Sequence, residues 1–126
     1  EEFAIFQNAG YIGLYGGLDV EDIHKRKGLA VGQKILDYMG STELIANLFR
    51  ISQTEEKLRK DQVMGAEVAT SVHYNVGKEV RTAIEKIDGT MPEDMSKPEK
   101  SIQQIEKEQM ARLKDKAKKG KIMLDE

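Results

Sequence analysis

The feature that most constrains the fold is the spacing of apolar residues, which recur every three or four positions along the chain. In the first segment these residues are Phe3, Phe6, Ala9, Gly10, Gly13 and Leu14. Such spacing places side chains on one face of an α-helix, whereas a half-buried strand requires strict alternation. The spacing therefore predicts an all-α protein, a compact bundle of about five to six helices, two or three long and the rest short.

Glycines and capping residues divide the first part of the chain into short helices. Gly10 and Gly13 lie on the apolar face of the first helix, where small residues allow another backbone to come close. The glycine pair at 16–17 is expected to end that helix. Asp19 is expected to cap a second helix, which stops at Gly28.

Two long helices are predicted after a short one at Gln33–Met39. The first of them has its N-cap at Ser41 or Thr42. Its apolar stripe consists of Leu44, Ile45, Leu48, Ile51 and Leu58. The second runs from about Glu67 to Asp88, and its apolar residues recur with the spacing of a coiled-coil seam. That seam consists of Ala69, Val72, Val76, Val80, Ala83 and Ile87.

Both prolines of the chain, Pro92 and Pro98, fall in one short segment. We therefore expect a helical core at 1–89, a linker at 90–98, and a charged helix with a mobile tail at 99–126. Within the linker, the spacing of Thr90 and Glu93 matches a capping box.

The last helix has a narrow apolar stripe among many lysines and glutamates. The stripe consists of Ile102, Ile105, Met110 and Leu113. A helix with so little apolar surface needs tertiary packing in water. We expect it to lie on another helix or on a second copy of the chain.

The sequence offers little for catalysis. The chain has no cysteine, which excludes disulfides, thiolate catalysis and cysteine-based metal sites. His24 and His73 belong to no spaced metal motif, and we interpret His73 as a packing residue. The serines lie in no nucleophile motif, and the glycines match no phosphate-binding loop. No catalytic residue, metal or cofactor is predicted.

A cluster of cations and tyrosines is the best candidate for a binding surface. Cations can contact phosphates, and tyrosines can stack on unpaired bases. The candidate residues are Tyr11, Tyr15, His24, Lys25, Arg26, Lys27, Lys34, Tyr38 and Arg50. The alternative is a solvated helix end with tyrosines half in the core, and the net charge of −2 favours that alternative.

No apolar run approaches the roughly 20 residues that span a bilayer, and no signal-peptide pattern opens the chain. We therefore expect a soluble, cytoplasmic protein with no membrane contact. The chain begins with Glu inside a helix-like stretch. We expect that an upstream part is missing.

Four stretches resemble the carboxy-terminal region of the DNA-damage-inducible protein D family. They are FAIFQNAGYIGLYGGLDVEDIHKRKGL, QKILDYMGSTELIANLFRISQTEEKLRKD, HYNVGKEVRTAI and GTMPEDM. The resemblance implies a bacterial cytoplasmic protein made under SOS control, in which a Bro-like domain precedes this region. It also implies modulation of recombinase filaments on single-stranded DNA, with no established enzymatic activity.

The leading hypothesis is therefore a non-enzymatic regulatory module that acts on recombinase filaments or single-stranded DNA. The first alternative is a domain that forms a homodimer and so pairs an absent DNA-binding domain, through the predicted seam or the last helix. The less favoured alternative is a metal-dependent nuclease. Its compact acidic candidates, Asp19, Glu21 and Asp22, are explained adequately as helix-capping residues.

Overall fold

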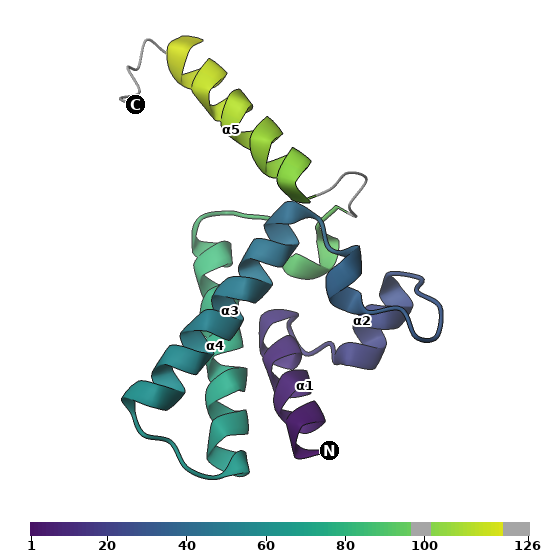
Figure 1. Cartoon of the computed structure of the whole chain (residues 1–126), viewed down its shortest axis with the longest axis vertical. Coiled ribbons are helices and arrows are strands. Elements are labelled where there is room, and N and C mark those ends of the chain that lie inside the picture. The colour runs from purple at the N-terminus through teal and green to yellow at the C-terminus, as the bar shows by residue number, and fades with distance from the viewer. Residues whose placement is uncertain (97–101, 120–126) are drawn as a thin grey trace.

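Five α-helices and two 3₁₀ turns make up the structure, a computed structural model that describes residues 1–96 and 102–119 (Figure 1). In chain order they are α1 (Glu2–Leu14), α2 (Val20–Arg26), η1 (Ile35–Tyr38), α3 (Ser41–Lys60), α4 (Ala66–Lys86), η2 (Pro92–Asp94) and α5 (Ile102–Lys119). The residues described contain no β-strand, which confirms the predicted fold class.

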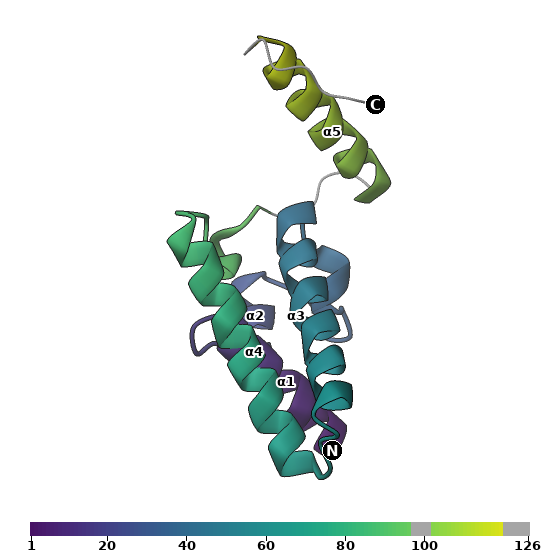
Figure 2. The same ribbon diagram turned by 90° about the vertical axis from the view of Figure 1, so that its left-hand side faces the viewer.

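The body of the molecule is built on α1, α3 and α4, which pack side by side (Figures 1 and 2). The contact between α1 and α4 is the largest interface between helices, and α3 packs against both. The apolar core between these helices and the α2–η1 segment consists of Tyr11, Leu14, Tyr15, Ile23, Ile35, Met39 and Val80.

Helices α1 and α4 approach each other backbone to backbone. A Cβ atom on Gly13 would overlap the carbonyl oxygen of Tyr74, and a Cβ atom on Gly77 would lie 2.7 Å from the carbonyl oxygen of Gly10. Such separations are far below ordinary van der Waals contact, so the crossing requires glycine. The prediction that Gly10 and Gly13 admit another backbone is confirmed.

The buried face of α3 is polar. Its buried residues are Ser41, Glu43, Asn47, Arg50 and Thr54. An apolar stripe normally faces the core, yet Ile45 and Leu48 of the predicted stripe are 54% and 51% exposed. Leu44 of the predicted stripe does pack against the core. The fully buried positions of α3 are nevertheless polar, because their side chains find hydrogen-bonding partners on the neighbouring helices.

The seam predicted on α4 is correct in its middle only. Val80 is buried and Val76 packs against the core. The other buried positions of α4 are His73 and Gly77, and Ile87 at the end of the seam is 78% exposed. The buried face is shifted because α1 packs over the glycine.

The start of α2 forms as predicted. Asp19 is the N-cap, and its Oδ1 accepts a hydrogen bond from the backbone N–H of Asp22 at 2.8 Å. The Asp22 carboxylate in turn accepts one from the backbone N–H of Asp19 at 3.1 Å, which completes a capping box. The short helix expected at Gln33–Met39 is present as the 3₁₀ turn η1.

Two predicted caps are wrong. Neither Ser41 nor Thr42 caps α3, because Gly40 occupies the N-cap position without a side-chain hydrogen bond. Glu93 does not pair with Thr90 in a capping box. Its carboxylate instead accepts two hydrogen bonds of 2.9 Å from Arg81, and this pair ties η2 to α4.

Helix α5 extends away from the body of the molecule (Figures 1 and 2). It contacts the start of α3, where Gln109 Nε2 donates a hydrogen bond to Ser41 Oγ at 2.9 Å. The side chains of Ile102 and Ile105 and the tail at 120–126 lie outside the described residues. The domain boundaries proposed above stay a prediction.

The helices described include none that is long and apolar enough to cross a membrane.

Replacing Gly13 by Ala should destabilise the protein by about 2 kcal/mol or more, because the methyl group meets the α4 backbone. In an exposed helix interior the same change stabilises by up to about 1 kcal/mol, so the sign of the effect is diagnostic. Urea unfolding measures it. The control is Gln7→Ala at an exposed position of α1, which should stay within about 0.5 kcal/mol. A Gly13→Ala variant as stable as the control would contradict the close crossing.

Candidate interaction site

Three of the nine predicted binding residues lie inside the molecule. Tyr11, Tyr15 and Arg50 are 9%, 1% and 1% exposed. Tyr15 and Arg50 lie in the interior between α1 and α3, whereas Tyr11, although mostly buried, also lines the groove described below.

Tyr15 and Lys27 meet at Glu43, whose side chain on α3 is fully buried. The Tyr15 hydroxyl donates a hydrogen bond to Glu43 Oε2, and Lys27 Nζ lies 2.7 Å from Glu43 Oε1. Asn47 Nδ2 donates to the Tyr15 hydroxyl oxygen at 3.0 Å. Burial and then the hydrogen bond to the Glu43 carboxylate raise the pKa of Tyr15. Lys27 is thus a fourth predicted binding residue whose side chain interacts with a buried group.

Arg50 links α3 to α1 and α4 through His73. A guanidinium can only donate, so Arg50 Nη1 donates to His73 Nε2. The imidazole is therefore neutral with its proton on Nδ1, which donates to the Phe6 carbonyl oxygen at 2.8 Å. Burial and then the Arg50 charge lower the pKa of His73 to about 4. The interpretation of His73 as a packing residue is confirmed.

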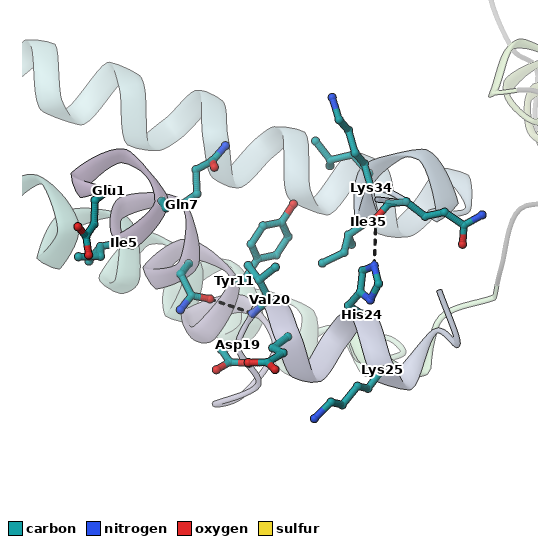
Figure 3. A pocket seen from close by; sticks show the side chains of 15 residues that line it. Glu1, Ile5, Gln7, Tyr11, Asp19, Val20, His24, Lys25, Lys34 and Ile35 are labelled. Carbon is teal, nitrogen blue, oxygen red and sulfur yellow. Dashed lines mark hydrogen bonds between the residues drawn. The ribbon is translucent and has the colours of Figure 1, made fainter. Parts of the chain in front are cut away.

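An open groove of about 1080 Å³ lies between α1, α2 and η1 (Figure 3). Its apolar lining consists of Ala4, Ile5, Tyr11, Val20, Ile35 and Leu36. Two hydrogen bonds hold its walls in place. Asn8 Oδ1 accepts from the Val20 backbone N–H at 2.8 Å, and His24 Nε2 donates to the Gln33 carbonyl oxygen at 3.0 Å.

Three further predicted binding residues, His24, Lys25 and Lys34, join Tyr11 on this groove (Figure 3). Lys25 and Lys34 are exposed, and neither forms an ion pair with another described residue. The groove also carries acidic side chains, which are Glu1, Asp19 and Glu21. The groove therefore has an apolar lining and carries both positive and negative side chains. We call it the α1–α2 groove.

The two remaining candidates lie outside the α1–α2 groove. Arg26 faces η2, where its Nη2 lies 2.8 Å from Asp94 Oδ1 and its Nε donates to the Glu93 carbonyl oxygen. Tyr38 on η1 is 37% exposed, and its hydroxyl accepts a hydrogen bond from Gln33 Nε2 at 2.7 Å. Arg26 is therefore paired, and Tyr38 remains accessible.

The acidic residues at the start of α2 do not form a metal centre. Asp19 and Asp22 accept the capping hydrogen bonds described above. Across residues 1–96 and 102–119, no group of three or more His, Asp or Glu side chains is arranged to hold a metal ion.

The interior partners Glu43 and Asn47 are the important residues that the sequence analysis missed. A signal for them exists in the sequence. Polar residues at 43, 47, 50 and 54 have the three-and-four spacing of a helix face. A polar face with that regularity predicts a buried hydrogen-bonding network as well as it predicts a solvated surface.

Comparisons with known proteins agree on one relationship. Residues 1–105 match the sequence profile of the family described as the DinD C-terminal domain. The chain is also 59% identical over 105 residues to the DNA damage-inducible protein D of Escherichia coli strain K12. The aligned region covers 83% of this chain and 38% of that relative. No solved structure matches the chain.

Replacing Lys27 by Ala should destabilise the protein by about 3 kcal/mol, because it leaves the Glu43 carboxylate buried without its cation. The matched control is Lys25→Ala, which removes an exposed lysine two positions away and should cost less than about 0.5 kcal/mol. Urea unfolding at neutral pH compares the two. Equal stabilities of the two variants would show that the Lys27–Glu43 pair is not buried as described.

His73 should make the protein sensitive to mild acid. Its pKa is about 4 in the folded state and about 6.5 when unfolded, so the unfolded state binds the extra proton between these values. Stability is therefore complete above about pH 6.5 and falls as the pH drops toward 4. The expected loss from His73 between pH 7 and pH 5 is about 2 kcal/mol.

The measurement is urea unfolding at pH 7 and pH 5 for the unaltered chain and for His73→Gln. The variant should be less stable at pH 7 but should lose about 2 kcal/mol less on acidification. An identical pH dependence in both proteins would contradict a buried neutral imidazole.

Proposed function

Because this chain belongs to the DinD C-terminal domain family, we propose that it is a non-enzymatic interaction module of a bacterial DNA-damage response. Its target is the recombinase filament on single-stranded DNA, in the cytoplasm, under SOS control. The chain spans 38% of the length of its E. coli relative.

The α1–α2 groove is the contact surface in this proposal. It combines an apolar lining with the two exposed lysines Lys25 and Lys34. Protein interfaces characteristically combine an apolar centre with a polar, charged rim. This composition is the observation that carries the proposal.

The direct partner is the recombinase protein of the filament rather than the bare strand. A surface that binds a phosphate backbone carries a cluster of positive charges. This groove carries acidic side chains as well. Residues 1–96 contain eleven Lys and Arg against sixteen Asp and Glu. A body with that balance repels DNA at long range.

The nuclease alternative has no support in the described residues, because the acidic cluster at the start of α2 is occupied by capping. A non-enzymatic interaction module requires a contact surface whose helices are held in fixed positions. The buried network around Glu43 and Arg50 supplies such rigidity, since it joins α1, α2, α3 and α4.

Replacing Lys25 and Lys34 together by Ala should weaken binding to preassembled filaments about threefold to tenfold and reduce its salt dependence. Lys27 is left intact in this test because its loss disturbs the fold. The matched control is the double variant Lys78→Ala and Lys86→Ala, which removes two exposed lysines of α4 away from the groove. Co-sedimentation with filaments at two salt concentrations measures both.

Two outcomes would overturn this proposal. Equal binding by the groove variant and the α4 control would remove the groove as the contact surface. Binding of bare single-stranded DNA that is as tight as filament binding, and that the groove variant loses, would make DNA the direct partner.

A further inference from the structure

The outward face of α3 carries an apolar patch. Ile45, Leu48 and Phe49 are 54%, 51% and 53% exposed. Their spacing of three and four residues makes them direct neighbours on the helix surface. We call these three residues the α3 patch. A contiguous apolar surface that a small protein leaves open is characteristic of an interaction site.

The same chain carries a second apolar surface without a partner, on α5. Met110 and Leu113 lie three residues apart and are 57% and 59% exposed. Helix α5 contacts the start of α3, where Gln109 donates to Ser41, and then extends away from the body (Figures 1 and 2). The α3 patch of the same chain stays about half exposed. A helix this polar is not stable without tertiary contacts.

The two surfaces have opposite charge environments. Residues 1–96 carry an excess of five acidic groups, whereas residues 106–119 of α5 contain six Lys and Arg against three Asp and Glu. The net charges of the two parts are therefore opposite, so the acidic body of one chain attracts the basic α5 of another.

We propose that the α3 patch is covered by α5 of a second copy of this chain, and that the exchange is reciprocal. The product is a two-fold symmetric dimer in which α5 of each protomer packs on the α3 patch of its partner. Most of α5 lies beyond residue 105, where the match to the family profile ends. The dimer therefore depends on a segment outside the family domain, and it is independent of the α1–α2 groove.

Sedimentation equilibrium of the full 126-residue chain at micromolar concentration tests this dimer. Phe49→Glu on α3 and Leu113→Lys on α5 should each weaken dimerisation at least tenfold and give monomers. Both positions are about half exposed, so the fold should persist, and circular dichroism checks it. The control is Val31→Glu, at a fully exposed loop position, which should remain dimeric.

Mixing the two monomeric variants gives the decisive result. In a mixed pair, one α3–α5 contact is unaltered, and the other joins the introduced acidic and basic side chains. The mixture should therefore recover a dimer, detected as a heterodimer by native mass spectrometry.

Three results would overturn the proposal. The first is a monomeric unaltered chain. The second is a dimer that Leu113→Lys leaves intact, which would indicate contact through α3 alone. The third is a mixture of the two variants that remains monomeric.

Discussion

The crossing of α1 and α4 at Gly10, Gly13 and Gly77 is the contact on which the rest of this structure depends. Because no side chain separates the two backbones there, α4 places His73 directly over Gly10. His73 in turn accepts a hydrogen bond from Arg50 and donates one to the α1 backbone. The glycines therefore set both the position of α1 and the point where α3 joins the bundle.

A second constraint follows from the polar side of α3. Glu43 is buried with Lys27 and Tyr15 as its partners, and the buried Arg50 donates hydrogen bonds to His73 and Asn47. The polar face of α3 thus lies in the interior, and Ile45, Leu48 and Phe49 are left on the outside. The same arrangement holds α2 against α3, so that α2 and η1 can form the far wall of the α1–α2 groove.

The helices could be predicted from the sequence because glycine, capping and apolar spacing act locally, as at Gly10, Asp19 and Gly28. The orientation of α3 could not be predicted from Ile45 and Leu48, because apolar spacing identifies an apolar face but not whether that face is buried. The same limit applies to the candidate site. Lys25, Arg26 and Lys27 are consecutive in sequence, yet they lie at the groove, at η2 and at Glu43, respectively. Lys34 reaches the groove beside Gln33, whose carbonyl oxygen is bound by His24.

Amide hydrogen exchange of the full chain tests whether the glycine crossing of α1 and α4 holds the domain together. If it does, the amides of α1 from residue 10 to 14 and of α4 from residue 73 to 80 exchange only with global unfolding, with equal free energies. Exchange of α1 by local fraying, at a free energy well below that of α4, would contradict it.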